Sequence, residues 1–321
     1  MIANTISDRN INCFTLTQIK NMALKKLSIK NPQELKSLFI DKASDYEEID
    51  FNMISHIEEL GFASKKDYYI PDELVSLKNL KKLSANNYCH LPANIDQFQS
   101  LEELYVSEEA IYNVPDSIKN TKSIKDLRIV FDPKNNEPQI SPEWIFNVKN
   151  VQKLTMSYCR FSEIKINNDN ANKLEEIDLS CSLSDLKIFP DLSSLKNLKK
   201  LNLSAETVMG QKMPPYELFG QMLDSIKNLE QIEELDISFW KPKKKSDWLV
   251  IKDGNVSIPD VFNRFPNLFR LSIANMKIDF VPESILGLTK LRELQIQGNN
   301  FDKDEIARIK TNLPKCGVQN Y

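Results

Sequence analysis

The stretch LRELQIQGNNF (291–301) has the pattern L-x-x-L-x-L-x-x-N-x-F, and weaker copies of it run back through most of the chain. Its apolar residues Leu291, Leu294 and Ile296 are spaced as in a short strand that buries one face. Asn299 stands where that strand turns. The first apolar position of most copies lies 21 to 24 residues after the previous one, at Leu35, Ile57, Leu80, Leu101, Ile124, Val151, Leu174, Leu198, Ile232, Leu268 and Leu291.

Prolines recur at a fixed position relative to these copies. In seven of them a proline stands three residues before an apolar residue, and six of the seven prolines lie nine residues before the next strand. Proline is favoured at the first position of a helix, where its missing N–H costs nothing. Each unit is therefore predicted to be a strand, a loop and a helical turn led by Pro71, Pro92, Pro115, Pro142, Pro215, Pro259 or Pro282.

Together these copies resemble the leucine-rich repeat family in its P-x-x-[I/L]-x-x-L-x-x-L form, over roughly residues 35–321, and most of all its small stand-alone bacterial members. The resemblance implies an α/β fold: a right-handed solenoid, or horseshoe, with a parallel concave sheet and short helices or turns on the convex side. The alternative is an ordinary α/β domain with leucine-rich helices. The family's turn asparagine occurs only at Asn299, with Cys159 as another accepted residue, so we expect looser turns elsewhere.

The repeat pattern divides the chain into an N-terminal cap (1–34), an array of about eleven repeats (35–298) and a C-terminal cap (299–321). In the C-terminal cap, Asp302 is predicted to begin a helix that runs to about Leu313, and a short closing strand follows. This is similar to the C-terminal cap of small bacterial members of the family. We expect no second domain.

The composition argues against several classes of protein. The 321 residues carry a net charge of −3, whereas a general nucleic-acid binder is usually basic. The five cysteines are scattered and form no C-x-x-C pair, which argues against disulfides or zinc and fits a reducing compartment. We see no signal peptide and no apolar run long enough to span a membrane. The sequence therefore predicts a cytoplasmic monomer, with export by a route without a cleaved signal left open.

Catalytic motifs are not found in this sequence. It contains no G-x-S-x-G, H-E-x-x-H, GK[ST] or G-x-G-x-x-G, and we predict no enzyme activity, metal site or cofactor. Cys89 beside His90 could form a nucleophilic dyad, but adjacent residues rarely face each other, and a structural histidine is the alternative. Recurrent glutamate pairs fill the exposed positions of L-x-x-L, so their periodicity argues against an acid–base pair.

Two repeats contain long insertions. In the repeat from Leu198, the extra residues follow Pro215 and predict an amphipathic helix with a buried stripe of Leu218, Met222, Leu223, Ile226 and Leu229. In the repeat from Ile232, they form a long loop at 239–258 that contains a predicted hairpin around Lys-Asp-Gly-Asn. Long loops in a compact array are usually functional or disordered. The alternative is a solvated lysine loop whose tryptophans pack on the core.

Side chains between and just after the buried strand positions should face solvent on the concave sheet. Aromatic residues on a rigid surface favour protein interfaces, and the aspartates there suit a partner's lysine or arginine. The alternative is that the aromatic residues only pack against the insertions. The predicted partner-binding residues are Tyr105, Arg128, Phe131, Tyr158, Asp178, Asn202, Asp236, Phe239, Trp240 and Trp248.

The predicted function is thus a non-enzymatic protein–protein interaction module that uses the concave sheet and the 239–258 loop. Binding without chemistry, with inhibition or scaffolding of the partner as the outcome, is what the family resemblance implies. An alternative function is binding of nucleic acid or another anionic surface through the lysines at 241–245. Steep salt dependence would be typical of that alternative.

Overall fold

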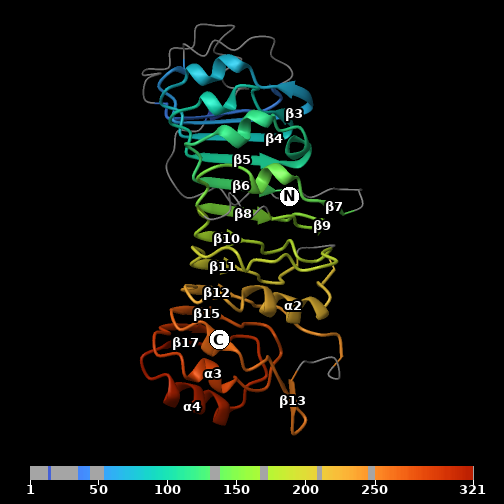
Figure 1. Ribbon diagram of the computed structural model, residues 1–321, viewed down its shortest axis with the longest axis vertical. Coiled ribbons are helices and arrows are strands. Elements are labelled where there is room, and N and C mark those ends of the chain that lie inside the picture. The colour runs from blue at the N-terminus through green and yellow to red at the C-terminus, as the bar shows by residue number, and fades with distance from the viewer. Residues whose placement is uncertain are drawn as a thin grey trace. The chain divides into compact units, whose positions relative to one another are not determined.

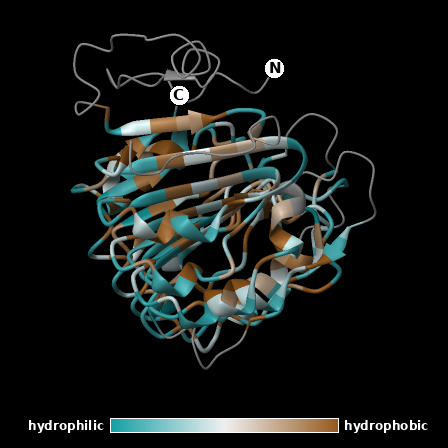
Figure 2. Cartoon of the chain, turned by 90° about the horizontal axis from the view of Figure 1, so that it is seen from above, coloured by the Kyte–Doolittle hydropathy of each residue, from teal (hydrophilic) through white to brown (hydrophobic). Residues whose placement is uncertain are grey.

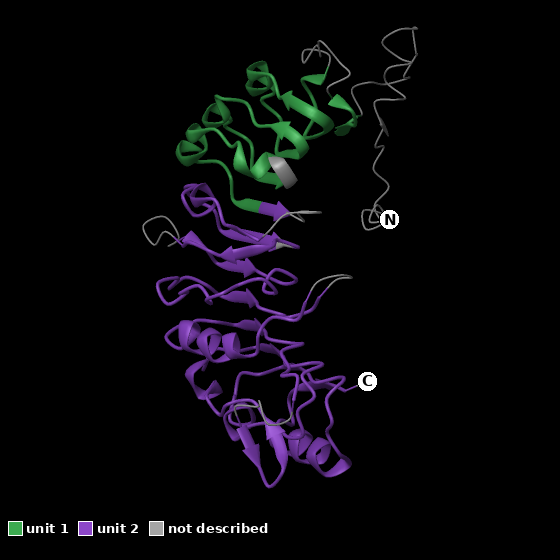
Figure 3. Ribbon diagram, turned by 90° about the vertical axis from the view of Figure 1, so that its right-hand side faces the viewer, with its two compact units in different colours: residues 1–127 green, residues 128–321 purple. Residues whose placement is uncertain are grey.

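The structure is a computed structural model that describes residues 14–15, 35–43, 54–130, 138–166, 173–207, 212–244 and 250–320. The chain forms two compact units, Met1–Leu127 and Arg128–Tyr321, which Figure 3 shows in green and purple. The boundary falls within strand β6 (Asp126–Val130). The predicted N-terminal cap lies outside the described residues except for strand β1 (Phe14–Thr15).

Unit 1 contains a parallel sheet whose strands follow one another in chain order. They are β1, β2 (Ser37–Ile40), β3 (Glu59–Tyr69), β4 (Lys82–His90) and β5 (Glu103–Ser107). Short 3-10 helices alternate with these strands: η4 (Asp72–Ser76), η5 (Ile95–Gln97), η6 (Glu108–Tyr112) and η7 (Asp116–Asn120). The second core positions of four successive copies, Leu38, Leu60, Leu83 and Leu104, pair directly across the sheet.

Unit 2 repeats this arrangement, as Figure 1 shows. Its parallel strands are β8 (Lys153–Ser157), β10 (Glu176–Asp178), β11 (Lys200–Asn202), β12 (Glu234–Asp236), β15 (Arg270–Ser272), β16 (Glu293–Gln295) and β17 (Gly317–Gln319). Leu154, Ile177, Leu201, Leu235, Leu271, Leu294 and Val318 stand in one unbroken register. This register confirms the predicted alignment of the copies.

The helices and two smaller sheets of unit 2 lie between these strands in the sequence. The helices are η8 (Glu143–Phe146), α2 (Glu217–Ile226), η11 (Phe262–Arg264), α3 (Glu283–Leu286) and α4 (Lys303–Asn312). Helix α2 buries Leu218, Met222, Leu223 and Ile226, as predicted. Strands β7 (Gln139–Ile140) and β9 (Phe161–Glu163) form one small sheet. Strands β13 (Val250–Lys252) and β14 (Asn255–Ser257) form the predicted hairpin.

The proline-led segments owe their three-residue spacing to hydrogen bonds. The carbonyl of Pro71 accepts from Leu74 N, that of Leu74 from Leu77 N, and that of Leu77 from Leu80 N, at 3.1, 3.0 and 3.2 Å. Residues three apart eclipse each other in a 3-10 helix, so all three leucines are buried on one side. Pro282 begins the same series. Both prolines are N-caps with extended backbone rather than first helical residues, which corrects the predicted position by one.

The hydrophobic core is built from these two sets of leucines. Brown, hydrophobic residues recur along the strands and helical segments in Figure 2. Leu80, Leu83 and Ile95 in unit 1, and Leu198 and Leu294 in unit 2, are 0–1% exposed. Full burial of such a side chain contributes about 1.5–3 kcal/mol. Each repeat therefore adds a layer of apolar contacts to its neighbour.

In several repeats, a side chain in the turn after the strand satisfies backbone groups of the preceding repeat. Asn299 does so fully: its amide oxygen accepts from Met276 N at 3.1 Å, and its nitrogen donates to Ile273 O at 2.8 Å. Ser182 makes the equivalent pair, accepting from Cys159 N at 2.9 Å and donating to Met156 O at 2.6 Å. Looser turns are expected wherever asparagine is missing, but Ser182 shows that a shorter side chain satisfies the same two groups.

Trp240 fills this turn position in the repeat from Ile232. Its indole Nε1 donates to Leu203 O at 2.7 Å, which is the carbonyl that corresponds to Ile273 O in the last repeats. The ring is 0% exposed and packs against Phe219 of α2, with ring centroids 5.5 Å apart. Trp240 thus combines the hydrogen bond of the turn with a large share of the local core.

One position before the turn residue, the backbone is left-handed in several repeats. The φ values are 59° at Tyr158, 59° at Cys181, 67° at Phe239, 55° at Asn275 and 73° at Gly298. Bulky residues in this region are uncommon because the side chain crowds the backbone. A Cβ on Gly298 would lie 2.1 Å from Asn275 Oδ1, so a larger residue there would also have to displace the Asn275 side chain.

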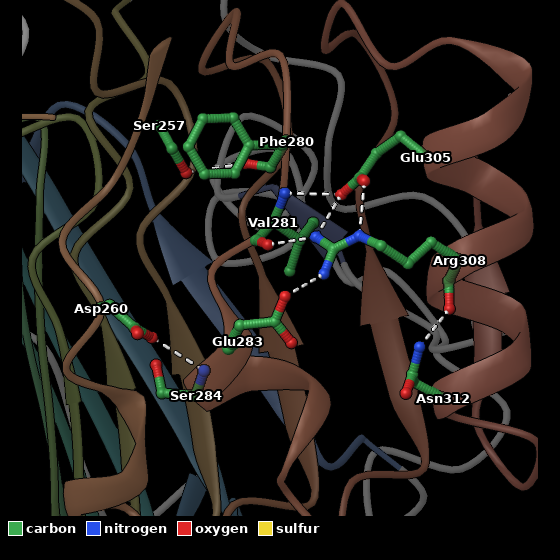
Figure 4. A network of polar contacts seen from close by, with 9 residues as sticks. All are labelled: Ser257, Asp260, Phe280, Val281, Glu283, Ser284, Glu305, Arg308 and Asn312. Carbon is green, nitrogen blue, oxygen red and sulfur yellow. Dashed lines mark hydrogen bonds and ion pairs between the residues drawn. The ribbon is translucent and has the colours of Figure 1, made fainter. Parts of the chain in front are cut away.

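The C-terminal cap has the predicted helix and closing strand. Asp302 caps α4 by accepting from Glu305 N at 2.8 Å, and β17 pairs with β16. Figure 4 shows how Arg308 joins α4 to the preceding repeat: its guanidinium contacts Glu305, Glu283 and the carbonyl of Val281. Glu305 also accepts from Val281 N at 2.7 Å. The cap is therefore attached through buried backbone groups as well as apolar contacts.

Replacing Trp240 by phenylalanine should lower the free energy of unfolding of the protein by about 1–3 kcal/mol, because the Leu203 carbonyl would stay buried without its donor. Chemical denaturation followed by circular dichroism measures the change. Phe269→Leu is the control, since Phe269 is 45% exposed and such changes usually stay within about 0.5 kcal/mol. Equal stability of the two variants would contradict this role for the indole.

Candidate partner-binding surface

A groove of about 290 Å³ lies on the sheet of unit 2, across strands β10, β11, β12, β15 and β16. Its centre is a row of three residues that we call the Asx row: Asp178, Asn202 and Asp236. They occupy the same position on three adjacent strands and pair directly in register. Neighbouring strands are about 4.8 Å apart, so the two carboxylates stand about 10 Å from each other on either side of the amide.

Each member of the Asx row is held by its own strand end. Asp178 Oδ1 accepts from Ser180 N at 2.8 Å, Asn202 Oδ1 from Ser204 N at 3.1 Å, and Asp236 Oδ1 from Ser238 N at 2.8 Å. The sequence shows the cause, because each is followed two residues later by serine. Side chains of Asp and Asn readily form such local bonds. The repeated motif thus fixes three polar groups on one surface.

The electrostatic setting of Asp236 differs from that of an ordinary surface aspartate. Burial raises the pKa of its carboxyl group, and the nearby Asp178 carboxylate raises it further, while hydrogen bonds from Ser238 and Ser272 oppose the rise. Ser238 Oγ and Ser272 Oγ lie 2.6 Å apart beneath it. Within the described residues, neither Asp178 nor Asp236 forms an ion pair. The groove therefore favours a cation.

A row of alternating charges borders the Asx row. Lys153 pairs with Glu176 at 2.6 Å, and Lys200 pairs with Glu234 at 2.9 Å. Arg270 bridges Glu234 and Glu293 at 2.9 and 2.7 Å. These partly exposed pairs contribute little each to stability, about 0–1 kcal/mol. They do neutralise one another, so the charge row leaves the Asx row as the uncompensated part of the groove.

The structure brings together only some of the predicted partner-binding residues. Asp178, Asn202 and Asp236 line one groove, whereas Tyr105 lies on β5 of unit 1. Arg128 is exposed on β6. Phe131 and Trp248 lie outside the described residues.

The three predicted aromatic residues that follow strands in unit 2 differ in their exposure to solvent. Tyr158 is 39% exposed and Phe239 is partly exposed, both with left-handed backbone. The prediction that Trp240 binds a partner is wrong. Its side chain is fully buried and hydrogen-bonded in the turn, so it offers no surface to a partner. Its packing matches the alternative in which the tryptophan belongs to the core.

Lys200, Glu234 and Arg270 line the groove but are absent from the predicted set. The signal for them was available, because they occupy the position before the second core residue in successive L-x-x-L copies. From the sequence alone, these positions are interpreted only as exposed to solvent. Only the register shows that opposite charges fall next to each other.

The described residues contain no cluster of three potential metal ligands and no helix long and apolar enough to cross a membrane. Burial raises the pKa of Cys89 to about 12, so its thiol stays protonated and is a poor nucleophile. The neighbouring His90 is buried, and its Nε2 lies 3.0 Å from Asp67 Oδ1. The Cys89–His90 pair is therefore structural.

Comparisons with known proteins place this geometry among repeat proteins. No protein-family model matches the chain. It is 24% identical over 292 residues to the human volume-regulated anion channel subunit LRRC8B, covering 89% of this chain and 29% of that protein. It is 26% identical over 298 residues to mouse CD180 antigen, covering 90% and 33%. A match to adenylate cyclase of Schizosaccharomyces pombe, 23% identical over 265 residues, covers 76% of this chain and 14% of the cyclase. The chain thus spans a third or less of these relatives.

One of three similar solved structures reaches a TM-score of 0.50. The Toll–Spätzle complex of Drosophila gives a TM-score of 0.50 at 16% identity, over 90% of this chain and 44% of that one. An internalin from Listeria monocytogenes gives 0.47 at 14% identity, over 95% and 87%. A repeat protein of Leptospira interrogans gives 0.37 at 20% identity, over 92% and 93%. The match to the Toll–Spätzle complex indicates a shared fold of parallel strands separated by short helices and turns.

The raised pKa of Asp236 predicts a pH dependence of stability. A folded-state pKa above the ordinary value of about 3.9 means that folding stability falls as pH rises through that range. Asp236→Asn removes this loss, so the stability of the variant relative to wild type should increase from pH 3 to pH 7. Denaturation at each pH measures the difference.

Asp191→Asn is the control, because the pKa of Asp191 is shifted in the opposite direction from that of Asp236. Hydrogen bonds from Ser193 lower the pKa of Asp191, so its contribution to stability is present above about pH 3.9 and is lost as pH falls. The stability of that variant relative to wild type should decrease from pH 3 to pH 7. Parallel curves for the two variants would contradict the assignment for Asp236.

Proposed function

Because this chain is a leucine-rich repeat protein, we propose that it binds a protein partner through the sheet groove of unit 2. The leucine-rich repeat fold generally serves protein interaction and is usually non-enzymatic. The adenylate cyclase match lies in the repeat region of that enzyme, so it supports no cyclase activity here. A cytoplasmic location stays a prediction.

The observation that carries this proposal is the Asx row. Two carboxylates and one amide stand in register in a groove, while the charges beside them are already paired. Leaving carboxylates partly buried without a cation costs free energy that a partner's cation would recover. A lysine or arginine side chain that enters above Asn202 would face both Asp178 and Asp236. Recognition of an exposed basic side chain is therefore the proposed mechanism.

The rigid sheet supports such recognition. Interfaces gain affinity when the contact groups are fixed before binding, because less side-chain freedom is lost. The three local hydrogen bonds from Ser180, Ser204 and Ser238 provide this preorganisation. Tyr158 and Phe239 contribute apolar area at the strand ends of the same unit, and bulky residues held with left-handed backbone are often found at functional sites.

The test is quantitative affinity capture from the native cell's lysate with Asp178→Asn/Asp236→Asn beside wild type. We expect the partner to be retained at least about tenfold less by the variant, because both carboxylates lose their charge while their local hydrogen bonds remain possible. The control is Asp224→Asn/Asp253→Asn, which removes the same charge from the surface of unit 2 outside the groove. If all three proteins retain the same set equally, the groove is not the binding surface.

A further inference from the structure

A second cleft in unit 2, of about 230 Å³, is lined by an unusual group of charges. Lys241, Lys243 and Lys244 come from the segment after β12, Lys277 comes from the turn after β15, and Asp279 and Asn300 also line the cleft. We call this the lysine cleft. Without Lys244, which has an interaction of its own, three lysines and one carboxylate line the cleft, which leaves an excess of two positive charges. The whole chain, in contrast, carries a net charge of −3.

The lysines of this cleft differ in their ion pairing from those of the sheet. Lys81, Lys125, Lys153, Lys199 and Lys200 each have a glutamate of a neighbouring repeat within 4 Å. Among the residues that the structure describes, Lys241, Lys243 and Lys277 have no such partner. The repeat pattern that neutralises lysines elsewhere does not extend to the cleft. The positive charge of these three lysines is therefore available to a ligand.

Asp279 does not supply the missing counter-charge by direct contact. Its Oδ2 accepts from Val256 N at 2.8 Å, and its Oδ1 accepts from Asn300 Nδ2 at 3.3 Å. The carboxylate thus attaches the β13–β14 hairpin to the last repeats. Both oxygens of Asp279 accept from neutral donors, and its single negative charge offsets only part of the positive charge of the cleft.

The backbone that carries the lysines is held in place on both sides. Lys241 follows Trp240, whose buried indole is anchored to Leu203, and Pro242 restricts the chain between Lys241 and Lys243. The carbonyl of Lys277 accepts from Asn300 Nδ2 at 2.9 Å. Lys241 and Lys277 therefore project from backbone that these contacts hold in place.

We propose that the lysine cleft binds a phosphate group carried by a phosphorylated segment of a protein partner. A phosphate monoester carries about −1.5 to −2 charges and three acceptor oxygens. It can therefore pair with several lysines at once, whereas a carboxylate ligand carries only one charge. No aromatic side chain lines the cleft within the described residues, whereas sites for single-stranded nucleic acid use aromatic stacking. The inference takes from the proposed function only that the partner is a protein.

The experiment uses fluorescence anisotropy with the full chain and a labelled glycine–alanine peptide that carries one phosphoserine. The matched peptide with serine and a short single-stranded oligonucleotide are the other probes. We expect binding of the phosphopeptide only, weakening as salt rises from about 20 to about 200 mM. The variant Lys241→Gln/Lys277→Gln should weaken it at least about tenfold.

Lys65→Gln/Lys66→Gln removes the same charge from exposed lysines of unit 1 and should leave phosphopeptide binding unchanged. So should Asp178→Asn/Asp236→Asn, which tests the proposed function alone. Equal binding of the two peptides, absence of phosphopeptide binding, or insensitivity to Lys241→Gln/Lys277→Gln would each overturn the proposal. Binding of the oligonucleotide without the phosphopeptide would replace it with a nucleic-acid site.

Discussion

In three repeats of this protein, a side chain at the strand-exit turn satisfies backbone groups that would otherwise oppose burial of the leucines. An unpaired buried carbonyl or N–H costs about 1–3 kcal/mol, which is comparable to the gain from burying one leucine. Asn299, Ser182 and Trp240 solve this problem with an amide, a hydroxyl and an indole. The stacked core, the register of the strands and the groove on the sheet all depend on those contacts.

Much of the repeat geometry could be predicted because it follows from local rules. The spacing of leucines predicts the register, Asp-Gly between β-prone runs predicts the β13–β14 hairpin, and Asp302 predicts the start of α4. The three-residue spacing after each proline reflects successive hydrogen bonds along one short segment. Each of these features is decided by residues close together in the sequence.

The rest could not be predicted because it depends on residues from different repeats. Trp240 looked like a binding residue because tryptophan favours interfaces, and only its contacts with Leu203 and Phe219 show why it is buried. The predicted register already places Asp178, Asn202 and Asp236 at one position of adjacent strands, but the groove that they line and the raised pKa of Asp236 depend on contacts between repeats. The lysine cleft needed Lys277, which lies far along the chain from the lysines of the long loop.

The alternating charge row has a consequence for how this chain can change in length during evolution. Lys153, Glu176, Lys200, Glu234, Arg270 and Glu293 succeed each other with no offset in register. Loss of the single repeat that carries Glu234 would place Lys200 beside Arg270, and duplication of any one repeat would place two identical charges side by side. Gain or loss of two consecutive repeats keeps the alternation. Because each of these exposed pairs contributes only about 0–1 kcal/mol, the charge row gives a small preference for changes of two repeats over changes of one.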